Sequence, residues 1–153
     1  MPFLHDGFKT TITISGISGK FDEIEVTPPE MDSGGGIEQT TMRNARYRTK
    51  LGKALITMGT VSVKVSYDPA VIAQMHNFMG TNRHVTVTFP DGSTLVFYAI
   101  ISKFTPDALK EGERPEATLE LEPSNMSTAA TPVEIAPVFA TGTTATTTTT
   151  AAP

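Results

Sequence analysis

The side chains that most often bind metals or catalyse reactions are few and scattered in this sequence. The three histidines, His5, His76 and His84, share no spacing that metal ligands use. The residues three and four positions from His76 are apolar or glycine, so they add no ligand on a helix. Cysteine is absent, which excludes disulfides, thiol catalysis and cysteine-bound zinc. We therefore expect each histidine at the surface or at a strand edge.

Sequence motifs for phosphate binding and for catalysis are equally weak. Gly34, Gly35 and Gly36 form a run similar to a phosphate-binding loop, but no Lys-Ser or Lys-Thr pair follows it. A flexible connection is the better interpretation of that run. The sequence has no Gly-x-Ser-x-Gly motif, and no carboxylate lies in an apolar stretch of the kind that holds a catalytic acid. We expect no enzymatic activity, no metal and no cofactor.

Two runs of like charge carry more information. Five acids without a base stand in the first run, which consists of Asp22, Glu23, Glu25, Glu30 and Asp32. Five bases without an acid stand in the second, which consists of Arg43, Arg46, Arg48, Lys50 and Lys53. The runs either form solvated loops or pair within one chain. Alternatively they lie on opposite faces of a subunit and make head-to-tail contacts, which close into rings or extend into filaments.

A third interpretation assigns the basic run to nucleic-acid binding. Its one aromatic residue is Tyr47, whereas proteins that bind single strands usually stack bases on several rings. The chain has sixteen acids against twelve bases and a formal net charge of −4, which argues against bulk nucleic-acid binding. A monomeric β-barrel that binds single-stranded nucleic acid through residues 43–53 is the alternative to an assembly protein.

Charge also divides the chain into two parts. Residues 1–122 hold all twelve bases and fifteen of the sixteen acids, whereas 123–153 hold only Glu134 among Thr, Ala, Pro and Ser. The length of 153 residues fits one domain. We place it at 1–122, followed by a Thr/Ala/Pro-rich C-terminal extension at 123–153, whose Thr-rich end predicts a flexible tail or linker. The start does not resemble a signal peptide, and no apolar stretch approaches the ~20 residues of a membrane helix, so no membrane partner is expected.

Alternating apolar and polar residues predict a mainly β fold. They indicate strands at residues 8–15, 61–67, 84–89, 94–101 and 116–122, and weaker ones at 24–27, 37–42 and 133–139. One helix is predicted at 69–79, with Asp68 as N-cap and Gly80 at its end. Its apolar face consists of Val71, Ile72, Met75, Phe78 and Met79. The fold expected is a β-sandwich or barrel with one packed α-helix.

The order of these elements over residues 8–122, with several short phrases, is similar to one viral family. The phrases are Ser-Gly-Ile-Ser-Gly at 15–19, Phe-Asp-Glu-Ile at 21–24, Ile-Glu-Gln-Thr-Thr-Met at 37–42, Met-Gly-Thr-Val-Ser-Val at 58–63, Tyr-Asp-Pro at 67–69, Phe-Pro-Asp-Gly-Ser-Thr at 89–94 and Ala-Thr-Leu-Glu-Leu at 117–121. This pattern resembles the major tail proteins, or tail tube proteins, of long-tailed bacteriophages. That family has no catalytic signature.

The resemblance implies a structural virion protein, made in the host cytoplasm and located in the phage tail. Six subunits would form a ring, each contributing strands to an inner β-barrel, and stacked rings would form the tube through which DNA is ejected. The implied partners are further copies of the chain, other tail proteins, and DNA in transit without specific binding. The loop at 32–53, with the basic run, would reach into neighbouring subunits and rings, and its three glycines would let it rearrange on assembly.

The lumen of such a tube should be acidic or neutral, because a basic lumen would hold the passing DNA. Thr118, Glu120 and Glu122, on the outward face of the last core strand, are candidates to line it. The rival set is Ser62, Lys64 and Ser66. A second rival function is a secreted adhesive β-sandwich with the Thr/Pro-rich tail as a stalk, against which the lack of a signal peptide weighs.

Overall fold

A single antiparallel sheet forms the body of the protein in a computed structural model that describes residues 9–17 and 21–142. Its strands lie in the order β1 (Thr11–Ile14), β8 (Asn82–Thr88), β9 (Thr94–Pro106), β10 (Glu116–Pro123), β7 (Val61–Ser66) and β2 (Glu23–Thr27). A short strand, β11 (Val138–Ala140), also pairs with β9. The mainly β fold with one helix that the sequence predicts is confirmed.

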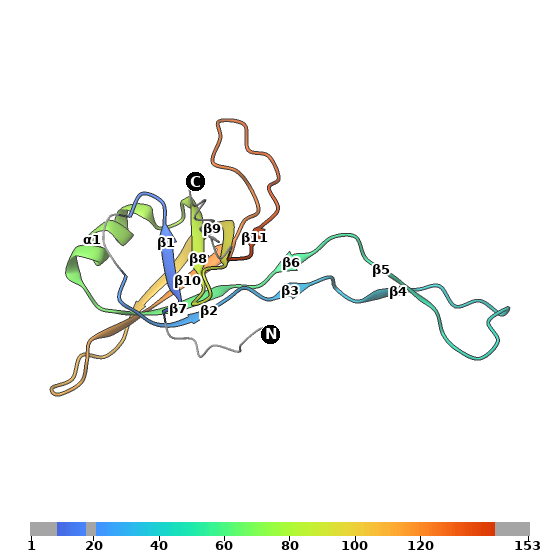
Figure 1. Cartoon of the computed structure of the whole chain (residues 1–153), viewed down its shortest axis with the longest axis horizontal. Helices are drawn as coiled ribbons and strands as arrows, with labels where there is room; N and C mark the ends of the chain where they lie inside the picture. The colour runs from blue at the N-terminus through green and yellow to red at the C-terminus, as the bar shows by residue number, and fades with distance from the viewer. Residues whose placement is uncertain (1–8, 18–20, 143–153) are drawn as a thin grey trace, which may run out of the picture.

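The inward face of this sheet supplies almost the whole hydrophobic core. Burial alternates strictly along β7 and β10, so that the core residues of these two strands are Val61, Val63, Val65, Ala117, Leu119 and Leu121. Because a single sheet must bury its own apolar face, it curls around the core until its two edge strands approach each other (Figure 1). The Ile12 amide of β1 donates a hydrogen bond to the Glu23 carboxylate of β2 over 2.8 Å.

Helix α1 (Pro69–Phe78) covers one end of the curled sheet (Figure 1). The Asp68 side chain accepts a hydrogen bond from the Ala70 amide, as an N-cap residue does, and Gly80 follows the helix with a φ of +74°. Val71 and Met75 are buried, but Met79 is 40% exposed, so its assignment to the buried face is wrong. Met79 is the C-cap, and its backbone is no longer helical. Across residues 9–17 and 21–142, no helix has the length and apolar character needed to cross a membrane.

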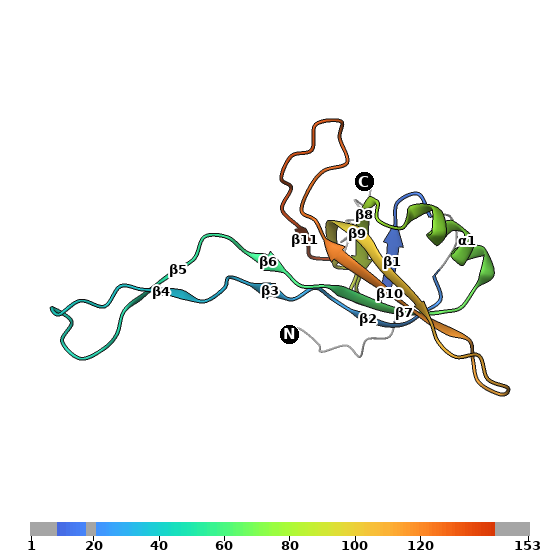
Figure 2. The same cartoon turned by 180° about the vertical axis from the view of Figure 1, so that it is seen from behind.

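Between β2 and β7 the chain leaves the body as a long two-stranded ribbon, residues 28–60, which we call the arm (Figures 1 and 2). Here β3 (Met31–Asp32) pairs with β6 (Thr57–Met58), and β4 (Gly36–Glu38) pairs with β5 (Lys50–Gly52). The strand predicted at 37–42 is thus shorter and begins one residue earlier. The loop predicted at 32–53 is in large part a hairpin.

The C-terminal extension returns to the sheet. After β10 ends, residues 124–137 project from the body, and β11 then pairs with β9 beyond the end of β10 (Figure 1). The strand predicted at 133–139 is therefore shorter and begins at Val138. A Cβ on Gly142 would meet the Asp91 carbonyl oxygen and come within 2.9 Å of the Gly92 carbonyl carbon, so this segment packs tightly on the turn between β8 and β9. Phe8 and residues 143–150, for which the sequence makes predictions, lie outside the described residues.

Candidate functional site

The histidines do not form a site in the part of the chain that the structure describes. His76 is exposed on α1, and the His84 ring packs edge-on against Tyr98 with centroids 5.3 Å apart. His5 lies outside the described residues. Within those residues no three His, Cys, Asp or Glu side chains gather where they could hold a metal ion. The surfaces that stand out are instead the arm, the groove at its base and one polar face of the sheet.

Most of the basic run lies at the far end of the arm. Residues 39–49, which we call the tip, connect β4 to β5 and carry Arg43, Arg46 and Arg48, while Lys50 and Lys53 follow on the returning strand. The Arg48 guanidinium lies 3.5 Å from the Glu38 carboxylate, in an exposed pair. Among the described residues, the other four bases of the run make no ion pair. The tip therefore presents unpaired positive charge to solvent.

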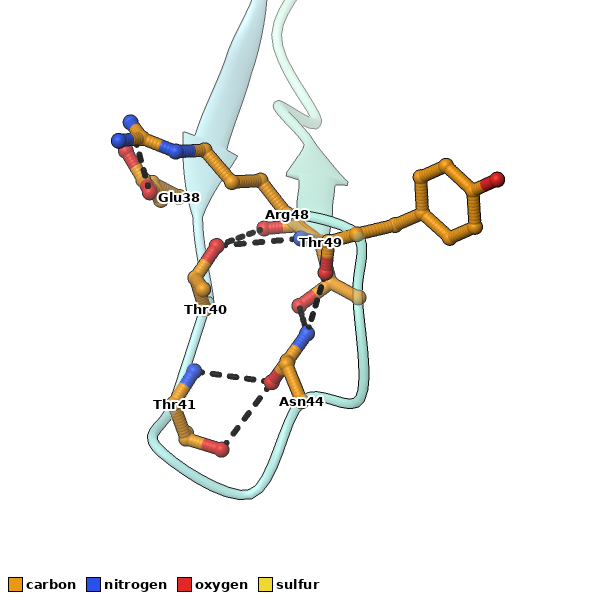
Figure 3. A network of polar contacts seen from close by, with 7 residues as sticks. Glu38, Thr40, Thr41, Asn44, Arg48 and Thr49 are labelled. Atoms are coloured by element: carbon orange, nitrogen blue, oxygen red, sulfur yellow. Dashed lines mark hydrogen bonds and ion pairs between the residues drawn. The ribbon is translucent and has the colours of Figure 1, made fainter.

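Asn44 holds the tip in one conformation (Figure 3). Its side-chain oxygen accepts hydrogen bonds from the Thr41 amide at 2.9 Å and from the Thr41 hydroxyl at 3.1 Å. Its side-chain nitrogen donates to the Tyr47 carbonyl at 2.9 Å and to the Thr49 hydroxyl at 3.3 Å. The Thr40 hydroxyl in turn accepts from the Thr49 amide at 3.1 Å. Asn44 was not among the predicted site residues, although an Asn in a loop is a common turn former that bonds nearby backbone.

The arm also exposes large apolar side chains. Ile37 and Leu51 are directly paired across β4 and β5, and both are about half exposed. Nearer the body, Met31, Leu55 and Ile56 are exposed as well. A two-stranded ribbon has little stability alone, and clustered exposed apolar groups mark surfaces that bind a partner. The exposed apolar surface of the arm is therefore typical of a surface that binds another protein.

The acidic run lies on and beside β2 and at the base of the arm. Glu23 and Glu25 lie on β2 with Asp22 just before them, and Glu30 and Asp32 lie at the base of the arm. Glu23 is turned toward β1, where it accepts the Ile12 hydrogen bond. In the described chain no ion pair joins this run to the basic one. The arm is thus acidic at its base and basic at its tip.

The two rival sets of lumen-lining residues belong to one face of the sheet. Thr118 pairs with Lys64 and Glu120 pairs with Ser62 across β10 and β7. Directly opposite residues of antiparallel strands point to the same side. The outward faces of the two strands are therefore one polar surface, with Ser66 at one end and Glu122 at the other.

Lys64 is the central cation of this polar face. Its ammonium lies 2.6 Å from the Glu116 carboxylate and 3.8 Å from that of Asp107. The hydrogen bond to Glu116 and the charge of Glu116 raise the pKa of Lys64 above its ordinary value, with smaller contributions from Asp107 and Glu25. Three acids therefore surround one base, and the local charge is negative.

Grooves lie along several edges of these elements, among them one of about 420 Å³ between β8, β9 and residues 124–132. Two of about 440 and 410 Å³ flank the seam where β1 approaches β2, on either side of Glu23. A smaller one of about 220 Å³ lies between the base of the arm and the C-terminal segment, lined by Met31, Ala54, Leu55, Ile56, Met58, Asn125, Glu134, Ala136 and Pro137. We call this smaller one the base groove. Nothing in the sequence pattern indicated it, because its walls come from segments far apart in the chain.

No family model matches this chain, and no curated protein matches it. Solved structures do match. One is a chain of the anti-feeding prophage (AFP) baseplate, whose cryo-EM structure was 6-fold symmetrised. The two chains superpose with a TM-score of 0.53 at 12% sequence identity, over 83% of this chain and 95% of that one. The likeness shows a shared fold.

Proposed function

We propose that this protein is a structural subunit of a phage-type tail tube, in which six copies form a ring and stacked rings form a conduit for DNA. The observation that carries the proposal is the arm, which extends a charged tip and exposed apolar side chains away from the body. In an assembly, these exposed apolar side chains would be buried against a neighbouring subunit. The shared fold with a chain of a 6-fold symmetrised phage-like particle agrees with this proposal.

The open sheet also favours assembly. An exposed sheet edge tends to pair with another chain, and closed rings use that tendency while removing the edge. In this protein β2 and β1 are the end strands of the sheet order, and the Glu23 side chain bridges them by a hydrogen bond. In the proposed ring, neighbouring subunits pair along such edges and continue the sheet into an inner barrel.

The polar face of β7 and β10 suits the lumen of the proposed tube. It carries Glu120 and Glu122, and its central Lys64 is neutralised by Glu116. On the same side of the sheet, Lys103 of β9 stands opposite Glu120. Acids outnumber bases on this face, so it attracts the phosphates of a passing DNA strand only weakly. The outer wall would then be the side that α1 covers.

The glycines at the base of the arm offer a place where the arm can be redirected on assembly. Gly34 and Gly35 have φ values of +72° and +77° and stand between β3 and β4. Left-handed backbone of this kind is readily adopted only by glycine. If the arm rearranges, amides of residues 36–52 will exchange hydrogen faster in the free chain than in the tube. Equal protection in both states would contradict this part of the proposal.

The test is negative-stain electron microscopy with light scattering across a concentration series of the full chain. Hollow tubes or six-membered rings are expected. A variant in which Asp32 and Thr57 are joined by an Asn-Gly turn, which removes residues 33–56, should lose them while circular dichroism still reports a folded body. The control Ala73→Ser, on the exposed surface of α1, should assemble like the parent. Assembly that survives removal of the arm contradicts the role given to it.

Single-stranded nucleic-acid binding is the second candidate function, because the Tyr47 ring is exposed among the three arginines of the tip. It is tested by titrating a single-stranded oligonucleotide at two salt concentrations. Binding that weakens with salt and is lost in the triple variant R43E/R46E/R48E, from a chain that stays monomeric, would replace the tube proposal with this one.

A further inference from the structure

The base groove is open and largely apolar, and one polar atom in its wall has no hydrogen-bond partner among the described residues. Leu55 is 84% exposed, Ile56 62% and Met31 60%, although all three line the same hollow. Asn125 lies in its wall with a φ of +52°, and its buried side-chain oxygen has no hydrogen-bond partner among the described residues. Buried polar groups in native proteins almost always have a partner, so this oxygen is an exception in the wall of the groove.

The base groove has one acid in its lining, Glu134. Asp32 follows Met31 on β3, and because side chains alternate along a strand, its carboxylate lies on the other face, where it accepts a hydrogen bond from the Gly34 amide over 2.7 Å. Lys53, the base nearest to the lining residues in the sequence, lies instead beside Gly34, with its ammonium 3.6 Å from where a Cβ of that glycine would stand. An occupant with an apolar side chain and adjacent positive charge is complementary to this site.

The tip of the arm offers that chemistry. Met42 is fully exposed at the tip and is followed at once by Arg43. Methionine is unbranched and polarisable, and it fits irregular apolar grooves well. The Asn44 network fixes the backbone on which Met42 and Arg43 stand, so little ordering is needed when the tip binds.

In the extended arm of this structure, the tip lies far from the base groove of its own chain (Figures 1 and 2). Ten residues, 32–41, lie between Met31 of the groove and Met42, and at ~3.3 Å per residue this length is roughly 30 Å. The β4–β5 and β3–β6 pairings hold the two apart.

We propose that the base groove binds the arm tip of a second copy of this chain, with Met42 in the apolar hollow and Arg43 against Glu134 in its wall. This deepens the proposed function, on which it rests, because it names the site that receives the arm. The contact is heterologous, since tip and groove are different surfaces. Repetition of such a contact closes into a ring or continues as a filament.

Cysteine pairing tests the contact directly, because the chain has no native cysteine. In the double variant M42C/I56C, mild oxidation should give a ladder of covalent oligomers on a non-reducing gel. A reductant should return these oligomers to monomers. A disulfide needs Cα atoms within ~7 Å, which the extended arm does not allow within one chain. A bond within one chain would in any case give a monomer band, so the ladder reports contacts between chains. M42C/A73C, with the second cysteine on the exposed surface of α1, is the matched control and should give no ladder.

M42C alone and I56C alone should give dimers at most. A ladder no stronger for M42C/I56C than for M42C/A73C overturns the inference. If rings or tubes are seen in the same samples, the proposed function stands and only the docking site is wrong. If the specific ladder forms but no ring or tube is seen at any concentration, the docking site stands and the tube proposal is contradicted.

Discussion

The Glu23 carboxylate on β2 accepts a hydrogen bond from the Ile12 backbone amide on β1, with 2.8 Å between nitrogen and oxygen. These two strands are the opposite ends of the sheet order. A side chain thus makes the connection that a backbone ladder would make in a closed barrel. Grooves remain on either side of this bridge, which leaves the seam accessible to another strand.

Glu23→Ala should lower the free energy of unfolding by about 1–3 kcal/mol, because it leaves the Ile12 amide without its acceptor in a part-buried position. Urea denaturation measures this. Asp22→Ala removes an exposed neighbouring carboxylate and is the control, with a change within about 0.5 kcal/mol. Equal losses in the two variants would mean that the bridge contributes nothing specific.

Lys64 should titrate above the ordinary lysine range, because the hydrogen bond to Glu116 and its charge raise its pKa. A raised pKa means that folding favours the charged lysine. The pair therefore stabilises the fold at pH values below ~10.4, the unfolded pKa, and this contribution is lost as pH rises through the higher folded-state pKa. In NMR titration of the lysine side chains, Glu116→Gln should move the pKa of Lys64 down.

Glu113→Gln is the matched control for that titration. Glu113 pairs with Lys110, an exposed residue on the β9–β10 hairpin, at 3.8 Å. The substitution removes a carboxylate of the same kind from the same hairpin, and the pKa of Lys64 should not respond. A response as large as that of Glu116→Gln would show that the general field of the hairpin, rather than the direct contact, sets the value.

Gly142→Ala should loosen the C-terminal segment from the sheet. The added methyl group would collide with the turn at residues 91–93, and overpacking of this kind costs about 1–3 kcal/mol. Hydrogen exchange of the β11 amides should accelerate accordingly, and the Phe89–Phe139 ring contact at 6.2 Å should be lost. Gly52→Ala, where a Cβ meets only open space, should leave β11 protected.

Asn44→Ala should disorder the tip without unfolding the body. Its side chain makes four hydrogen bonds that hold the loop together, and the arm projects away from the core. We expect the tip amides to lose protection, while the global free energy of unfolding changes by less than about 0.5 kcal/mol. Arg46→Ala, in the same loop, is the control and should leave the tip amides unchanged. A global loss of stability would instead show that the arm and the body unfold together.

The strands of the sheet and the helix were predictable because their signals are local. Alternation along residues 61–66 and 116–121 follows directly from which side chains face the core, and Asp68 and Gly80 mark the helix ends by their own chemistry. Met79 was assigned wrongly because helical spacing says nothing about where the helix stops. The pairs β3–β6 and β4–β5 were missed as a ribbon, since short exposed strands have no inward face to impose alternation.

The sequence alone determined the charge runs, the absence of cysteine, the mainly β fold and the small-residue end of the chain. Tertiary structure decided that the basic run is a preorganised tip, that Thr118 and Lys64 share one face, and that Leu55, Asn125 and Glu134 wall a common groove. The physical reason is the range of the interactions. Periodicity and capping act over a few residues, whereas register and packing join segments that only the folded chain brings together.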